Sequence, residues 1–162
     1  MTEDKSLKTA ECRMLARPLF TTKTQSTQRL HREYVSTRLN KLSYEVIGAA
    51  LEVHRMLGPG LLESAYRKSL CRELFVRGIP YKKEHPLPLE YKGLYLDCGY
   101  RMDIVVDDSI VVEVKSVEAL APIHDAQLLT YLRIGGYKLG LLINFNVAVL
   151  KNGIHRKILG YD

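Results

Sequence analysis

The sequence has few cysteines and no long apolar run. Its three cysteines, Cys12, Cys71 and Cys98, are too few and too scattered for a disulfide framework or a zinc site. No apolar run approaches the roughly 20 residues that span a bilayer, and no apolar segment near the amino terminus predicts secretion. We therefore expect a cytoplasmic protein in a reducing setting, with no membrane partner.

Most of the chain also lacks an excess of either charge. The net charge of the 162 residues is +6. Residues 1–41 hold nine basic and four acidic side chains, or +5, so residues 42–162 hold 15 basic and 14 acidic ones, or +1. Sequence-independent binding of nucleic acid depends on many contacts from Lys and Arg to phosphates. The pI of the whole chain therefore says little about what the folded part binds.

Residues 1–41 show no sustained apolar period and are rich in Thr, Ser, Arg and Lys. This composition predicts a basic extension that is disordered or weakly helical, followed by one domain over residues 42–162. The extension is interpreted as a solvated tail, a basic arm on nucleic acid, an organelle transit peptide, or unselected sequence after an upstream start codon. Glu3, Asp4 and Glu11 count against a transit peptide, which is usually poor in acids.

The most informative segment is 101–115. Its alternation of apolar and charged side chains predicts two strands joined by a turn at 107–109. A two-residue loop would put the two acids, Asp103 and Glu113, on opposite sides of the sheet. A three-residue loop places them directly opposite one another on one side. Only that register gathers the aliphatic side chains on one face: Ile104, Val106, Ile110, Val112 and Val114.

Opposed carboxylates repel one another unless a cation lies between them or one of them takes a proton. Lys115 follows Glu113 by two residues and therefore shares its face. An acid pair beside a lysine on a rigid sheet is what a hard divalent cation and a hydrolytic water require. The alternative is an ordinary solvated hairpin in which Lys115 is only a counter-ion.

Apolar periodicity and Gly/Pro breaks predict the other elements. Helices are expected at 42–57, from the Gly58-Pro59-Gly60 break to residue 77, and at 122–134. Further strands are expected at 87–91, 94–97, 138–144, 147–150 and 154–159, the last two as a hairpin around Asn152-Gly153. Together these elements indicate an α/β sandwich with a mixed sheet flanked by helices.

The element order and the acidic positions resemble the PD-(D/E)XK nuclease superfamily, whose restriction-endonuclease-like core is αβββαβ. Met102-Asp103 stands in place of Pro-Asp, and Glu113-Val114-Lys115 is intact. A closer resemblance is to the GxxExxY protein family, and it covers residues 42–160. The segments that carry it are Gly60-Leu-Leu-Glu63-Ser-Ala-Tyr66, Tyr100-Arg-Met-Asp-Ile-Val-Val, Gln127-Leu-Leu-Thr-Tyr131-Leu and Leu141-Leu-Ile-Asn-Phe.

The resemblance implies a nuclease that uses Mg²⁺ or Mn²⁺ to hydrolyse phosphodiester bonds in DNA, with RNA as a further substrate class. It implies that Asp103, Glu113 and the backbone carbonyl of Val114 hold the metal. Lys115 would then orient the attacking water or neutralise charge on the phosphate, or act as a base if its pKa fell on desolvation.

Three further side chains have both a catalytic and a plainer interpretation. Glu63 resembles a water-mediated or second-metal ligand, but an acid is also favoured near a helix amino terminus. Gln127 and Tyr131 lie four apart on one helix face and resemble a pair that borders the active site in the exonuclease-like branch. They could equally be a surface hydrogen-bond pair. Tyr66 is expected in the core.

Two other classes of protein stay open at this point. One is a catalytically inactive nuclease-fold module that binds nucleic acid or a protein partner. The other is a small structural protein in which the acids bind a stabilising cation. In the nuclease interpretation a single domain presents one active site, so cutting both strands of a duplex would need a homodimer.

Overall fold

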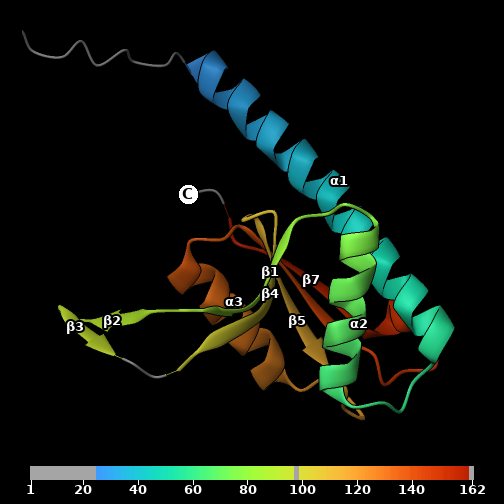
Figure 1. Ribbon diagram of the computed structural model, residues 1–162. Coiled ribbons are helices and arrows are strands. Elements are labelled where there is room, and N and C mark those ends of the chain that lie inside the picture. The colour runs from blue at the N-terminus through green and yellow to red at the C-terminus, as the bar shows by residue number, and fades with distance from the viewer. Residues whose placement is uncertain (1–24, 97–98, 161–162) are drawn as a thin grey trace, which may run out of the picture.

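A five-stranded mixed sheet forms the centre of the computed structural model, which describes residues 25–96 and 99–160 except for the side chain of His31 (Figure 1). Its strand order is β1-β4-β5-β6-β7. Only β5 and β6 run parallel, and the other neighbours are antiparallel. The bounds are β1 Tyr81–Pro86, β4 Arg101–Val106, β5 Ile110–Lys115, β6 Leu139–Asn144 and β7 Ile154–Ile158.

Helices cover both faces of this sheet (Figure 1). Helices α1, Gln25–Leu57, and α2, Glu63–Val76, pack on one face and share its core with aliphatic side chains of β4, β5 and β6. Helix α3, Pro122–Gly135, packs on the other face through Leu128, Tyr131 and Leu132. In the described ranges no helix is both long enough and apolar enough to cross a membrane. The mixed sheet flanked by helices agrees with the predicted architecture.

The β4–β5 hairpin has the predicted register. Ile104 pairs with Val112 and Val106 with Ile110, so the loop has three residues. The face opposite these residues is also buried, because Val105 and Val111 are covered by α3. The alternative of a solvated hairpin is therefore wrong, and any charge on this second face lies within or beside a packed layer.

The first long helix begins much earlier than predicted. Helix α1 starts at Gln25 rather than at residue 42, so residues 25–41 are helical. Leu39 is buried and Val35 packs partly against the same core, which ties this part of the helix to the fold. Residues 1–24 of the predicted extension lie outside the described residues. The helix start was predicted wrongly because only a few side chains in this stretch touch the core, so the sequence shows no apolar period there.

The first strand of the sheet was missed. Segment 81–86 forms β1 and pairs with β4, although its side chains are mostly polar. Polar and charged residues are common on an edge strand, where they discourage pairing with other chains. The strands expected at 87–91 and 94–97 are instead β2, Leu89–Tyr91, and β3, Leu94–Leu96, which form a separate two-stranded ribbon. This ribbon projects beyond the main sheet in Figure 1; Asp97 lies outside the described residues.

The carboxyl-terminal hairpin was also predicted wrongly. Residues 150–153 form a short 3₁₀ helix, η1, and β7 pairs directly with β6 rather than with residues 147–150. A Cβ atom on Gly153 would stand 2.3 Å from the backbone oxygen of Asn144. Glycine is therefore present because two backbone segments approach closely, and it does not mark a hairpin turn.

Candidate active site

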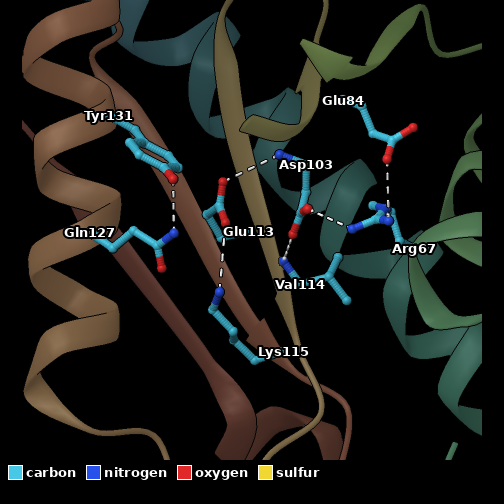
Figure 2. Close-up of polar contacts among 8 residues, drawn as sticks. All are labelled: Arg67, Glu84, Asp103, Glu113, Val114, Lys115, Gln127 and Tyr131. Atoms are coloured by element: carbon cyan, nitrogen blue, oxygen red, sulfur yellow. Dashed lines mark hydrogen bonds and ion pairs between the residues drawn. The ribbon is translucent and has the colours of Figure 1, made fainter. Parts of the chain in front are cut away.

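Three carboxylates occupy one row across neighbouring strands (Figure 2). The β1–β4 register aligns Glu84 with Asp103, and the β4–β5 register places Glu113 on the other side of Asp103. Glu84 has φ of 47°, which an L-residue other than glycine rarely adopts. The row thus lies where β1 departs from extended geometry and where regular pairing of β4 with β5 ends.

Side chains replace backbone pairing between β4 and β5 at this row. The backbone N–H of Val114 donates to Oδ2 of Asp103 at 2.9 Å. The backbone N–H of Asp103 donates to Oε1 of Glu113 at 3.3 Å. Each carboxylate is therefore oriented by the neighbouring strand, which holds the two acids together in spite of their mutual repulsion.

Glu113 is nearly inaccessible to solvent, with 3% of its side chain exposed. Burial raises its pKa to about 8, with a further contribution from the charge of Asp103. The positive charge of Lys115 offsets only part of this rise in pKa, because its Nζ atom stands 3.9 Å from Oε2 of Glu113. Without a bound cation, this carboxyl group therefore holds a proton near neutral pH, which is one of the two outcomes that the sequence predicts for opposed acids.

Arg67 is a central residue of this site that the sequence analysis missed. Its Nη1 atom donates to Oδ1 of Asp103 at 2.9 Å, and its Nη2 atom lies 3.4 Å from Oε1 of Glu84. Burial alone would lower the pKa of Arg67, but Asp103, Glu84 and Glu63 together raise it. The sequence feature that could have indicated Arg67 is its spacing from Glu63: four residues along a helix place the two side chains on the same face.

Glu63 is the first residue of α2 and is partly buried. Its charge contributes to the raised pKa of both Glu113 and Arg67, so it belongs to the electrostatic surroundings of the carboxylate row. An acid at this position also interacts favourably with the positive end of the helix dipole. The geometry is compatible with both interpretations of Glu63.

Tyr66 holds the loop that precedes α2. Its buried hydroxyl donates to the carbonyl of Gly58 at 2.5 Å and accepts from the N–H of Leu61 at 3.1 Å. The hydroxyl of Ser116, directly after β5, donates to the carbonyl of Leu61 at 2.6 Å. Tyr66 is thus a core residue, as expected, and it helps to place Glu63 near the end of β5.

Gln127 and Tyr131 face the acid pair from α3 (Figure 2). The amide of Gln127 donates to the hydroxyl of Tyr131 at 2.9 Å. Burial raises the pKa of Tyr131, Gln127 partly offsets this shift, and the charges of Glu113 and Asp103 add to it. The pair therefore lies at the border of the carboxylate row, and both residues are at least partly buried.

A model of the PD-(D/E)XK nuclease superfamily matches residues 40–157. The chain belongs to this superfamily. No curated protein and no solved structure matches it significantly. The matched region contains all six side chains that the sequence analysis selected, whereas the finer likeness to the GxxExxY family depends on the quoted motifs alone.

PD-(D/E)XK nucleases usually use divalent metal ions. Two carboxylates and a backbone carbonyl are hard oxygen donors of the kind that Mg²⁺ prefers, and Mg²⁺ keeps several of its own waters. Asp103 and the buried Glu113 fit a cation, which would take the place of the proton on Glu113, although no group of three Asp, Glu, His or Cys residues within 25–96 and 99–160 is arranged to hold one. Arg67 donates a hydrogen bond to one oxygen of Asp103, so its positive charge would compete with that of a metal ion.

Proposed function

We propose that the protein is a metal-dependent nuclease that hydrolyses phosphodiester bonds in nucleic acid, with DNA as the main substrate and RNA as a second one. One observation carries the proposal: Asp103 and a buried Glu113 stand together beside Lys115 on a rigid sheet. Burying such a pair costs free energy unless a cation or a proton compensates it. Superfamily membership adds the expectation of nuclease chemistry.

Each residue of the site has a role in this proposal. Asp103, Glu113 and the carbonyl of Val114 hold Mg²⁺ or Mn²⁺, and Glu63 acts through a water or a second ion. A divalent ion held by these residues would supply a Lewis acid for a water molecule and positive charge beside the phosphate. The side chain of Lys115 is 14% exposed, so it is largely shielded, and its ammonium group orients the water or the phosphate oxygens.

The Gln127–Tyr131 pair supplies positioning in the same proposal. Because Gln127 donates to the hydroxyl of Tyr131, the two side chains hold each other at the border of the acidic row. From there they can contact the ammonium of Lys115, a water molecule or the substrate. We do not assign either of them a proton-transfer role, since the buried Tyr131 hydroxyl has a raised pKa and stays protonated near neutral pH.

A cationic pocket beside the acids supports a nucleic-acid substrate. It has a volume of about 360 Å³ and lies between α2 and β1. Its charged lining contains four cations and one carboxylate, namely Arg67, Lys68, Arg72, Lys83 and Glu84. Grouped basic side chains bind phosphates. The near-neutral net charge of residues 42–162 does not reveal this local excess of positive charge, because it is a sum over all of these residues.

One observation favours the catalytically inactive module instead. Arg67 already neutralises Asp103 through an ion pair of 2.9 Å, as an internal substitute for a metal would. In that case the cationic pocket would still bind nucleic acid, but divalent metal would have no effect on the protein. The two functions are therefore separated by a measurement of metal binding that needs no knowledge of the substrate.

The test is a titration of Mn²⁺ into the purified protein by calorimetry, with and without a short oligonucleotide. Saturable binding that is lost in Asp103→Asn and in Glu113→Gln, but kept in the surface control Glu45→Gln, supports the nuclease. Cleavage of labelled DNA and RNA is then measured with the same four proteins. Absence of binding up to millimolar Mn²⁺, also with the oligonucleotide present, would overturn the nuclease proposal.

Two further parts of the proposal depend on the sequence alone. A cytoplasmic location is inferred from the sparse cysteines; the one that the structure describes, Cys71, is free and buried. A homodimer is proposed only for cleavage of both strands of a duplex. The boundary between an extension at 1–41 and the nuclease domain at 42–162 stays a prediction, although helix α1 runs across it from Gln25 to Leu57.

A further inference from the structure

A second pocket has Gln127 and Tyr131 of α3 in its lining. These two residues lie on the side of the carboxylate row opposite Arg67 (Figure 2). The volume of the pocket is about 400 Å³. It lies between α3 and the segment that leads into the β2–β3 ribbon, and its lining is mostly apolar. Its lining includes Tyr100, Ala126, Gln127, Thr130 and Tyr131.

This pocket shares two residues with the border of the candidate active site. Gln127 and Tyr131 line the pocket and also border the acid pair (Figure 2). The charges of Glu113 and Asp103 act on Tyr131, which shows that the pocket wall is electrostatically close to both acids. A group bound in this pocket would therefore lie next to the two residues that border the acid pair.

The shape and chemistry of the pocket suit a flat heteroaromatic ring. Tyr100 is 47% exposed and meets Tyr131 edge to face, with 6.5 Å between ring centroids. The exposed part of the Tyr100 ring is therefore available to stack on a ligand. The amide of Gln127 and the hydroxyl of Thr130 add hydrogen-bonding groups to the apolar walls. A nucleobase combines both features, a π-face and a polar edge.

Aromatic and basic side chains continue from this pocket along the β2–β3 ribbon. A neighbouring pocket shares Tyr100 with the first and adds Tyr95 and Arg101 to the lining. Tyr95 is 76% exposed, and the ammonium of Lys92 lies 5.4 Å from the ring centroid of Tyr91. Exposed rings beside cations are how proteins bind single strands, because bases stack while the cations meet phosphates.

We infer that the pocket between α3 and Tyr100 binds an unpaired nucleobase next to the phosphodiester that is cut, so that the preferred substrate carries single-stranded nucleotides at the cleavage point. This inference depends on the proposed nuclease function and names its substrate class. A base inside a duplex is stacked on both sides and must leave the stack before it can enter a pocket. Single strands, overhangs and frayed ends avoid that cost.

The test is fluorescence anisotropy with a labelled oligonucleotide in EDTA, so that no cleavage occurs. Single-stranded DNA, single-stranded RNA, a blunt DNA duplex and a single strand with abasic sites are compared at one salt concentration. Both single strands are expected to bind about tenfold or more tightly than the blunt duplex, because base stacking on aromatic side chains is available only to them. The abasic strand is expected to lose that advantage.

Two variants test whether the preference for single strands depends on this pocket. Ala126→Phe fills the pocket from an exposed helix position, and Ala126→Ser is its control of similar size. Tyr100→Ala removes the stacking ring, and Tyr44→Ala removes a more exposed ring from α1 as its control. Ala126→Phe and Tyr100→Ala are expected to weaken single-strand binding about tenfold, while both controls bind as the wild type does.

Each contrary result has a defined meaning. Equal binding of single strand, duplex and abasic strand, or no change in Ala126→Phe, overturns the base pocket even if Mn²⁺ binding and cleavage are intact. Base-dependent binding without any Mn²⁺ binding supports the pocket and overturns hydrolysis. A dimer in analytical ultracentrifugation that Ala126→Phe dissociates, with oligonucleotide binding unchanged, assigns the pocket to a second copy of the chain and overturns the inference.

Discussion

Arg67 donates a hydrogen bond of 2.9 Å to Oδ1 of Asp103, across 36 residues of sequence. The guanidinium comes from α2 and the carboxylate from β4, so the packing of the helix on the sheet creates the pair. The side chain of Asp103 is 14% exposed and that of Arg67 is 23% exposed. In the metal-free protein this arginine takes the part of a cation at the acidic row, and a bound metal must compete with it.

Replacing Arg67 tests its effect on stability and its effect on metal binding separately. Arg67→Gln leaves Asp103 without its charged partner, so the metal-free protein is expected to lose about 1–2 kcal/mol of unfolding free energy in urea. Mn²⁺ affinity is expected to rise, because Oδ1 of Asp103 becomes free for the ion. Arg29→Gln breaks an exposed ion pair on α1 and serves as the matched control. Unchanged or weaker Mn²⁺ binding in Arg67→Gln would contradict competition between the arginine and the metal.

The stability of the metal-free protein should fall as the pH rises. Glu113 has a pKa of about 8 in the folded protein against an ordinary value of 4.5, so folding favours its protonated form. Its contribution to stability is fully present below about pH 4.5 and is lost as the pH rises through about 8. The slope can reach about 1.4 kcal/mol per pH unit between these limits.

The measurement is the melting temperature in EDTA over this pH range for the wild type and for Glu113→Gln. The difference between the two proteins isolates the contribution of Glu113 from that of every other ionisable group. The variant is expected to show the shallower decline, and added Mn²⁺ is expected to stabilise the wild type most at the alkaline end, where the carboxylate is ionised. Parallel curves would show that Glu113 is not protonated in the fold.

Lys115 is expected to matter for turnover more than for folding. Lys115→Ala should lower the cleavage rate about a hundredfold or more, because a positioned cation or proton-transfer group is lost. Its ammonium lies 3.9 Å from Glu113, a loose contact, so the fold and most Mn²⁺ binding should persist. Cleavage and circular dichroism are compared with the exposed control Lys151→Ala. Wild-type turnover in Lys115→Ala would remove this lysine from the mechanism.

Tyr66 should affect stability through its hydroxyl group alone. Tyr66→Phe keeps the ring, which stacks on Phe145 at 4.6 Å, but removes the bonds to the backbone of Gly58 and Leu61. A loss of about 1–2 kcal/mol in unfolding free energy is expected because the Leu61 N–H and the Gly58 carbonyl lose their partner. Urea denaturation beside the exposed control Tyr44→Phe checks this. Equal stability of both variants would show that the loop needs no such support.

Much of the local structure could be predicted from the sequence. Alternation within 101–115 was sufficient for the register of β4 and β5, because only one register gathers the aliphatic residues on one face. The apolar run at 138–144 likewise predicted the buried strand β6, and Gly136, with φ of 72°, ends α3 where expected. The predictions failed where few side chains touch the core, as in the amino-terminal part of α1, or where an edge strand is polar, as in β1.

The acidic row shows how far the site could be predicted from the sequence alone. By itself the sequence determined that Asp103 and Glu113 lie opposite one another, because side chains alternate along neighbouring strands. Only the tertiary structure decided that Glu113 is buried and that Arg67 contacts both Asp103 and Glu84. Burial and long-range ion pairs depend on which distant elements pack together, and local periodicity carries no information about that choice.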